Sequence, residues 1–210
     1  MIFIHHRINT IQDLKDIPLM DGVEVDVRYH KNTLILHHDP FHHHEIYTDT
    51  LEIFLQNWNS KGPIVLNLKT EGIEKRCIEL MAKYEVKNWF FLDMSMPILV
   101  KYSDKAKKKE FKYFSPDNLS VRFSDREPIE YALSFKGKAS WVWVDYFSHF
   151  PLNEKNVFLL KNAGFKICLV SPEIQNNSIF NTNQIVDICS NLNIDAVCTK
   201  NPQAWIRFKN

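Results

Sequence analysis

The feature that most restricts how this chain can fold is a regular alternation between short apolar runs and longer polar or amphipathic stretches. Most residues in each run are β-branched, aromatic or leucine, which is typical of strands buried on both faces. Eight such runs occur, at positions 2–4, 23–27, 64–68, 89–92, 119–123, 141–144, 166–170 and 196–198. The alternation predicts a sheet whose strands are connected by helices.

Several of the stretches between these runs have the spacing of amphipathic helices. The clearest are residues 73–84, 155–163 and 182–192, and Gly164 indicates that the second of them ends just before a strand. Strands that alternate with helices form parallel sheets, and eight such units predict a compact (β/α)8 TIM-type barrel. Because about 250 residues is typical for this fold, some helices must be short or missing. A doubly wound open sheet is the structural alternative, but no G-x-G-x-x-G motif follows the first strand.

Composition narrows the class of protein. No linker divides the chain, so residues 1–210 are expected to form a single domain. The formal net charge of +1 argues against nucleic-acid binding, which relies on a strong basic field. No transmembrane segment is expected, because no apolar stretch approaches 18 residues, and the first run is too short for a signal peptide. The four cysteines form no C-x-x-C pair, which indicates reduced thiols and a cytoplasmic location.

Polar and charged residues stand at the end of nearly every predicted strand. In a barrel of this type, these ends line the mouth where active sites form. One polar residue at a strand end is ordinary, but charged or imidazole groups at almost all eight ends indicate a site. The residues are His6 and Arg7, Glu24 and Asp26, Asn67 and Lys69, Asp93, Arg122, Asp145, Glu173, and Lys200.

Two carboxylates in the second run are the strongest indication of a bound cation. Glu24 and Asp26 are two residues apart on a strand, so their side chains point the same way. If they point into the barrel, the two charges must be solvated, neutralised or bound to a cation, and Mg²⁺ or Ca²⁺ suits carboxylate oxygens. The alternative is a polar face turned to water, with Val23, Val25 and Val27 directed inward.

Histidines add chemistry to this cation site. A metal ion with two imidazoles suits cleavage of a phosphodiester, because one histidine removes a proton and the other protonates the leaving alkoxide. The cation would hold a phosphate oxygen and offset its developing charge. Arg7 and Lys69 are candidate phosphate contacts. Arg122 is either a further substrate contact or part of a structural ion pair.

The ordered set of motifs resembles the glycerophosphodiester phosphodiesterases, which are phospholipase C-like phosphodiesterases with a TIM-type barrel. The resemblance rests on His6-Arg7, on Glu24-x-Asp26, on His38-Asp39 and on Lys69 at the end of the third predicted strand. Residues 194–202, IDAVCTKNP, resemble the closing strand of that family. The match therefore reaches both ends of the chain, and its sharpest elements lie in the first 70 residues.

The resemblance implies a function and a role for each matching residue. The family hydrolyses glycerophosphodiesters to glycerol 3-phosphate and an alcohol, usually with a divalent cation. By this resemblance His6 and His38 form the acid/base pair, and Arg7 and Lys69 face the phosphate. Metal ligation is implied for Glu24, Asp26 and Asn67, the last of which stands where the family usually has a glutamate. An asparagine ligates through its carbonyl oxygen but lacks the negative charge, which should weaken cation binding.

Two other functions remain open from the sequence. One is a catalytically silent barrel that binds a phosphate or sugar phosphate. The other is a related phospholipase D-type or cyclising phosphodiesterase, in which a hydroxyl of the substrate attacks the phosphorus. The expected substrate is a small-molecule or lipid-derived phosphodiester. The cluster His42-His43-His44-Glu45 is interpreted as a solvated loop near the mouth rather than a transition-metal site.

Overall fold

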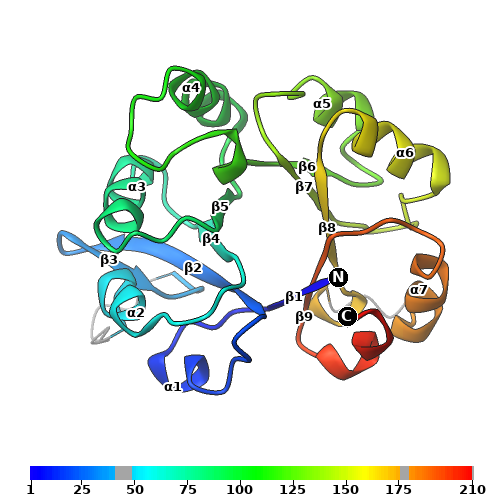
Figure 1. The fold of residues 1–210 in the computed structure, drawn as a ribbon, viewed down its shortest axis with the longest axis horizontal. Helices are drawn as coiled ribbons and strands as arrows, with labels where there is room; N and C mark the ends of the chain where they lie inside the picture. The colour runs from blue at the N-terminus through cyan, green and yellow to red at the C-terminus, as the bar shows by residue number, and fades with distance from the viewer. Residues whose placement is uncertain (41–48, 176–179, 210) are drawn as a thin grey trace.

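Eight parallel strands form a nearly closed ring in the computed structural model, which describes residues 1–40, 49–175 and 180–209. Their order around the ring is β5-β4-β2-β1-β9-β8-β7-β6 (Figure 1). This arrangement confirms the predicted TIM-type barrel, and each predicted run is one of its strands. The strands are β1 (Ile2–His5), β2 (Gly22–His30), β4 (Ile64–Leu68), β5 (Trp89–Leu92), β6 (Ser120–Phe123), β7 (Trp141–Val144), β8 (Lys166–Val170) and β9 (Ala196–Thr199).

The ring is weakest between its first and last strands in this order, β5 and β6. An isolated parallel bridge links them, between Phe91 of β5 and Leu119, the residue before β6. Two side chains reinforce it: the hydroxyl of Ser120 donates to the carbonyl of Phe91 (2.6 Å), and the amide of Asn118 donates to the carbonyl of Trp89 (2.8 Å). We call this junction between β5 and β6 the seam of the ring. Hydrogen bonds from side chains replace part of the missing backbone ladder there.

The helices surround the ring, and some are short, as the chain length predicted. Helices α1 and α5 span four and five residues. The three helices predicted from amphipathic spacing are confirmed as α3, α6 and α7, and α6 ends before Gly164, whose φ of 90° is left-handed. The helices are α1 (Ile11–Leu14), α2 (Leu51–Asn57), α3 (Glu74–Lys83), α4 (Met96–Lys107), α5 (Ile129–Leu133), α6 (Glu154–Asn162) and α7 (Thr182–Cys189), with 3₁₀ turns η1 (Pro116–Asn118), η2 (Pro172–Ile174) and η3 (Pro202–Phe208).

An antiparallel hairpin at the mouth departs from the simple barrel pattern. Strand β2 runs beyond the ring, and β3 (Thr33–Leu36) folds back against it. The two-residue turn between them, Lys31-Asn32, has φ values of 45° and 67°, the backbone that tight hairpins favour. The hairpin brings the chain back to the ring, where the N–H of His37 donates to the carbonyl of Asp26 (3.0 Å).

The two faces of the strands bury different residues. Most inward side chains are apolar, among them stacked Phe90 and Trp141 with ring centroids 4.6 Å apart. The outward side chains, which include Val23, Val25 and Val27, pack into a larger core beneath the helices. Both faces of the ring are therefore lined by buried apolar side chains, apart from the polar residues at the mouth.

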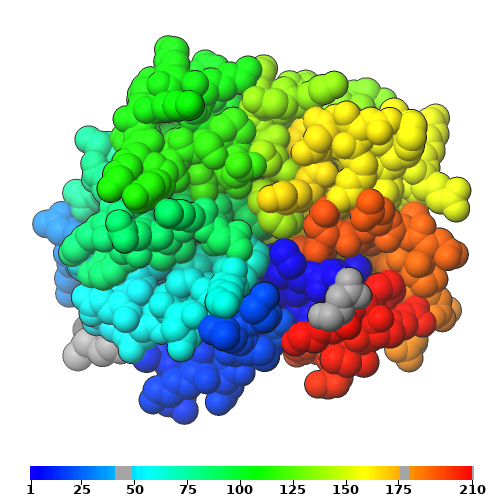
Figure 2. Space-filling model, viewed as in Figure 1, coloured from blue at the N-terminus to red at the C-terminus, as the bar shows by residue number. Residues whose placement is uncertain are grey.

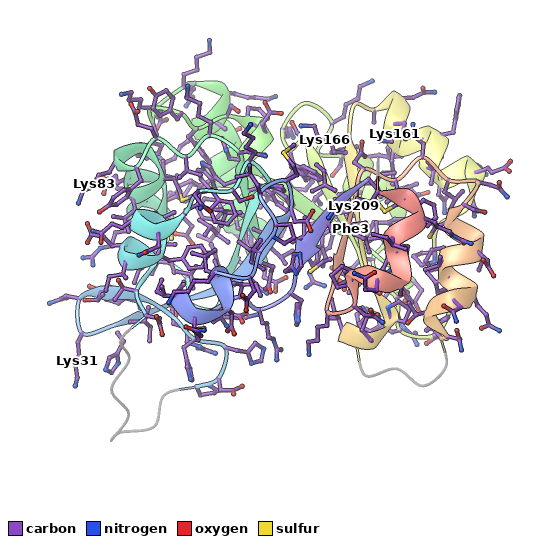
Figure 3. All side chains as sticks on the ribbon, turned by 60° about the horizontal axis from the view of Figure 1, so that its bottom comes forward. Phe3, Lys31, Lys83, Lys161, Lys166 and Lys209 are labelled. Carbon is purple, nitrogen blue, oxygen red and sulfur yellow. The ribbon has the colours of Figure 1, made fainter. Side chains whose placement is uncertain are left out.

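Both ends of the described chain lie at the face of the barrel opposite the mouth. The terminal amine of Met1 donates to the carbonyl of Phe208 (3.1 Å), and the ammonium of Lys209 lies 5.2 Å from the ring centroid of Phe3 (Figure 3). Figure 2 shows the blue N-terminal residues beside the red C-terminal ones in this face. Among the described helices, none has the length and apolar character needed to cross a membrane.

Replacing Gly22 with alanine is expected to destabilise the barrel, because Gly22 begins the strand that carries both carboxylates. A methyl group added there would lie 2.5 Å from the carbonyl oxygen of Pro63. This oxygen belongs to the backbone, so relieving the clash would require the backbone to move. We expect Gly22→Ala to lower the free energy of unfolding by about 2 kcal/mol or more in urea titrations. Gly72→Ala is the control, because its methyl group meets nothing within 4 Å and it should lose only about 1 kcal/mol from its left-handed backbone. Equal losses would contradict the clash.

Candidate active site

Glu24 and Asp26 point into the barrel. Their exposed fractions are 1% and 0%, so the alternative in which this face looks at water is wrong. Glu24 is held by two donors: the N–H of Arg7 donates to Oε2 (2.8 Å), and the amide of Asn67 donates to Oε1 (2.8 Å). Arg7 can present its N–H this way because its backbone is left-handed, with φ of 57°.

Asp26 is held by a residue that the sequence analysis did not assign. The amide of Asn9 donates to Oδ2 of Asp26 (2.8 Å), and the N–H of Asp26 donates back to Oδ1 of Asn9 (2.8 Å). Two cations lie further out, with Nζ of Lys69 at 3.4 Å and Nε of Arg7 at 3.9 Å. The only signal for Asn9 in the sequence is its position three residues after His6.

Burial and mutual repulsion control the charge of the carboxylate pair. Burial, and then the neighbouring charge of Asp26, raise the pKa of Glu24 to about 7, although its hydrogen bonds from Asn67 and Arg7 act in the opposite direction. The pair therefore carries fewer than two full negative charges near neutral pH. A bound cation would favour the fully ionised pair.

His6 lies beside the pair as an uncharged imidazole. Its Nε2 is 3.8 Å from Oε2 of Glu24, and its buried Nδ1 has no hydrogen-bond partner in the structure. Burial, followed by the positive charges of Arg7 and Lys200, lowers the pKa of His6 to about 3. The 3.8 Å approach to Glu24 is therefore a contact with a neutral ring rather than an ion pair.

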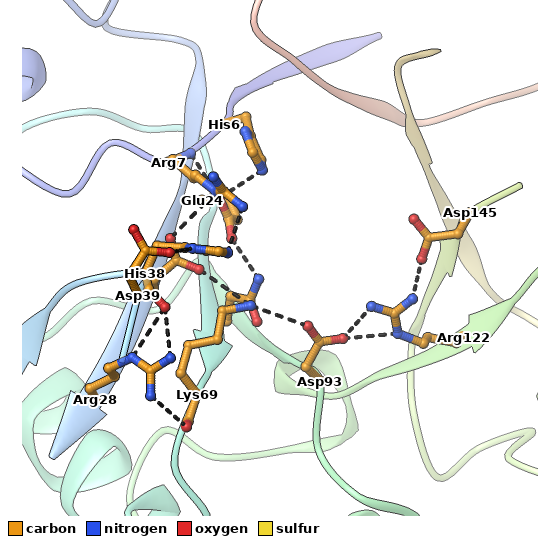
Figure 4. A network of polar contacts seen from close by, with 12 residues as sticks. His6, Arg7, Glu24, Arg28, His38, Asp39, Lys69, Asp93, Arg122 and Asp145 are labelled. Atoms are coloured by element: carbon orange, nitrogen blue, oxygen red, sulfur yellow. Dashed lines mark hydrogen bonds and ion pairs between the residues drawn. The ribbon is translucent and has the colours of Figure 1, made fainter. Parts of the chain in front are cut away.

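The β2–β3 hairpin places His38 on the other side of Arg7. The guanidinium Nη2 of Arg7 is 2.5 Å from Nε2 of His38, and Nδ1 of His38 is 2.7 Å from Oδ1 of Asp39 (Figure 4). Because arginine only donates, these contacts assign the ring proton to Nδ1, where it is donated to Asp39. This hydrogen bond lowers the pKa of Asp39. Arg28, which the sequence analysis did not assign, fixes the same segment by donating twice to the carbonyl of His38 (2.7 and 3.2 Å).

Arg122 is part of an ion-pair chain along the mouth. It donates to Asp93 and to Asp145, and the amide of Gln175 also donates to Asp145 (2.9 Å). Asp93 in turn lies 3.6 Å from Nζ of Lys69 (Figure 4). Burial lowers the pKa of Arg122, but the charges of Asp145 and Asp93 raise it overall. Of the two roles left open by the sequence, the structural ion pair is the one that these contacts display.

The donor set predicted for a cation has the right chemistry for Mg²⁺ or Ca²⁺. Within the described ranges, no three His, Cys, Asp or Glu residues gather as a metal cluster, and the predicted set has two acids and one amide. Oδ1 of Asn67 is buried without a hydrogen-bond partner in the structure, and Oδ1 of Asp26 makes no hydrogen bond and has only the ion-pair contact with Lys69 at 3.4 Å. Oxygen ligands are what these hard cations take, so the residues fit. The cluster His42–Glu45 lies outside the described residues.

Comparisons with known proteins agree with this architecture. No family model and no curated protein matches the sequence. Among solved structures, a glycerophosphodiester phosphodiesterase from Agrobacterium tumefaciens matches with a TM-score of 0.67 and 12% identity, over 98% of this chain and 99% of that one. The chain has the fold of the glycerophosphodiester phosphodiesterases. A second such enzyme, a glycerophosphoryl diester phosphodiesterase from Parabacteroides distasonis, matches with a TM-score of 0.66 and 12% identity, over 99% of this chain and 86% of that one.

The raised pKa of Glu24 predicts how stability depends on pH in the absence of divalent cations. The folded carboxyl group keeps its proton up to about pH 7, whereas the unfolded one loses it near pH 4.3. The stabilising contribution is therefore fully present below pH 4 and is lost as the pH rises through 7. Its size is on the order of 3 kcal/mol.

Urea titrations at pH 5 and pH 8, with chelator present, measure this effect. Glu24→Gln should remove most of the loss between the two pH values, whereas Glu79→Gln, at an exposed glutamate on α3, should keep it. Titration of His6 does not account for a difference in pH dependence between the three proteins, because all of them contain His6. Parallel pH profiles for wild type and Glu24→Gln would show that Glu24 is ionised throughout.

Proposed function

We propose that this protein is a divalent-cation-dependent phosphodiester hydrolase that acts on glycerophosphodiesters. One observation carries the proposal: Arg7 joins the two halves of the predicted machinery. Its N–H binds Glu24 inside the barrel, while its guanidinium contacts His38 on the hairpin. The fold shared with two enzymes named as glycerophosphodiester phosphodiesterases supports the same conclusion.

In this proposal Arg7 and Lys69 bind the phosphate. Both are at the mouth, and both lie within 4 Å of Asp26. The guanidinium of Arg7 can donate to two phosphate oxygens at once, and Lys69 adds a point charge. Arg122 faces two carboxylates already, so its role is to hold Asp93 beside Lys69.

The two histidines move protons. His6 is uncharged near neutral pH and is the base that deprotonates the attacking water. A negative phosphate beside it would offset the positive charges that lower its pKa. His38 is the proposed acid, and the free position of its ring is Nε2, because Nδ1 donates to Asp39. Nε2 accepts from Arg7 in this structure, so His38 protonates the leaving alkoxide only when Arg7 turns to the phosphate and Nε2 carries a second ring proton.

Glu24, Asp26 and Asn67 are proposed to hold the cation, Mg²⁺ or Ca²⁺. When bound, it would supply positive charge next to a non-bridging phosphate oxygen. The amide of Asn67 donates to Glu24, which leaves its carbonyl oxygen available. The carbonyl of Asn67 thereby replaces an acidic ligand at lower charge.

The compartment proposed is the cytoplasm, and the substrate is a small-molecule or lipid-derived phosphodiester. All four cysteines are free and buried, and burial raises the pKa of each thiol. Unpaired thiols suit a reducing compartment.

A silent phosphate-binding barrel is the second candidate function. It is favoured by the lysine at 3.4 Å from Asp26, which neutralises this carboxylate without a metal ion. It predicts ligand binding without turnover. A cyclising reaction would also use the two histidines, and product analysis in ¹⁸O-labelled water separates it from hydrolysis because a cyclic product contains no label.

Turnover of glycerophosphocholine is the direct test. We expect release of glycerol 3-phosphate, its loss with chelator, and recovery with Mg²⁺ or Ca²⁺. His6→Ala and His38→Ala should each lower kcat by about a hundredfold or more, because each removes a proton-transfer group. His149→Ala, at an exposed histidine (73%), is the matched control and should keep wild-type turnover. Equal turnover in all variants would refute the assignment, and binding without turnover would favour the silent barrel.

Cation titration tests the proposed ligands separately from catalysis. Asn67→Asp restores a third carboxylate and should tighten Mg²⁺ or Ca²⁺ binding by roughly tenfold in calorimetry, because charge count sets affinity. Asn67→Ala removes the carbonyl ligand and should weaken it. Identical affinities in both variants and in wild type would place the cation elsewhere.

A further inference from the structure

A cavity of about 550 Å³ opens beside the proposed phosphate site, between α4 and α5. Its position follows from the weak seam of the ring, since an isolated bridge links β5 and β6 and these two helices flank them (Figure 1). Its apolar walls come from both sides of the seam and are formed by Met94, Met96, Leu99, Val121, Pro128 and Tyr131. The volume is in the range of small-molecule sites.

The cavity adjoins the proposed phosphate site. Asp93 and Arg122 line it, and Asp93 is also 3.6 Å from Nζ of Lys69. Lys69 is in turn 3.4 Å from Asp26. A phosphate held by Lys69 would therefore be separated from the cavity by the side chain of Asp93. A phosphodiester carries two ester groups, and the cavity offers space for one of them.

The polar groups around the cavity are already engaged. Arg122 is paired with two carboxylates, and Glu127 accepts a hydrogen bond from the hydroxyl of Ser124 (3.0 Å). Arg126 donates to the hydroxyl of Ser148 (2.7 Å). These groups therefore have partners without a ligand, and most of the wall that is left to a ligand is apolar.

The walls favour a flexible, unbranched occupant. Methionine side chains adapt their shape to irregular apolar groups, and two of them, Met94 and Met96, line the cavity. Met96 is 53% exposed in the structure. A ligand chain would remove this apolar surface from water.

We propose that this cavity binds an unbranched alkyl chain carried on one ester arm of the phosphodiester, so that the enzyme selects alkyl-substituted substrates. The inference rests on the proposed function for the identity of the phosphate site. Each methylene group buried contributes about fourfold in affinity, so a long chain should dominate recognition.

Binding of alkyl phosphates tests the cavity without requiring turnover. The intact protein should bind decyl phosphate, used below its critical micelle concentration, at least tenfold more tightly than methyl phosphate. With ¹³C-methyl-labelled methionine, NMR spectra should show decyl phosphate shifting Met94 and Met96 but leaving Met20 unchanged. Met20 is the matched reference because it is exposed (62%) and precedes β2 at the opposite end of the barrel. Equal affinity for the two phosphates, or equal shifts at Met20, would overturn the proposal.

A pair of variants locates the effect. Met96→Glu places a charge in the wall and should abolish the preference for decyl phosphate while leaving methyl phosphate affinity unchanged, and Met20→Glu should change neither. If Met96→Glu weakens both ligands equally, the cavity does not hold the chain. Hydrolysis is measured separately. Tighter binding of decyl phosphate without any turnover supports the alkyl-binding cavity and contradicts the proposed hydrolase. Turnover that does not depend on the length of the alkyl chain supports the hydrolase and contradicts the cavity.

Discussion

Two carboxylates buried side by side in an otherwise apolar barrel are the constraint on which the site depends. Glu24 and Asp26 repel one another and lose their hydration, so the protein must supply donors or cations from elsewhere. Arg7 and Asn9 come from the segment after β1, and Asn67 and Lys69 come from β4 and the residue after it. The need to stabilise this charge therefore draws three parts of the chain together.

The barrel and the hairpin contribute differently to this assembly. Parallel pairing of β2 with β1 and β4 fixes which residues share the interior. The hairpin then adds an element outside the ring and brings His38 to the guanidinium of Arg7, whose N–H binds Glu24. The rigid scaffold thus holds the charged groups, while a second, separate element delivers the imidazole.

The sequence predicted the strands, the barrel and the residues gathered at its mouth, because apolar runs and charged strand ends are local features. It could not decide which way Glu24 and Asp26 point, since Val23, Val25 and Val27 are equally buried on the other face. Nor could it pair Arg122 with Asp93 and Asp145, because these residues are 29 and 23 positions away in the chain and meet only when β5, β6 and β7 lie side by side. The hydrogen bonds of Asn9 and Arg28 depend on how the loops after β1 and β3 fold, which the pattern of apolar and polar residues does not specify.

The turn at Lys31-Asn32 has a consequence for how such a site can change. This turn lies outside the ring. The distance between the imidazoles of His6 and His38 is therefore set by the length and register of the hairpin rather than by the packing of the eight strands. Insertions or deletions there would slide one imidazole relative to the other while the apolar cluster inside the ring, formed by residues of other strands, stayed as it is. Leu34 and Leu36 of the hairpin pack in the outer core, so evolution can adjust the spacing of the two imidazoles only in ways that keep these leucines buried.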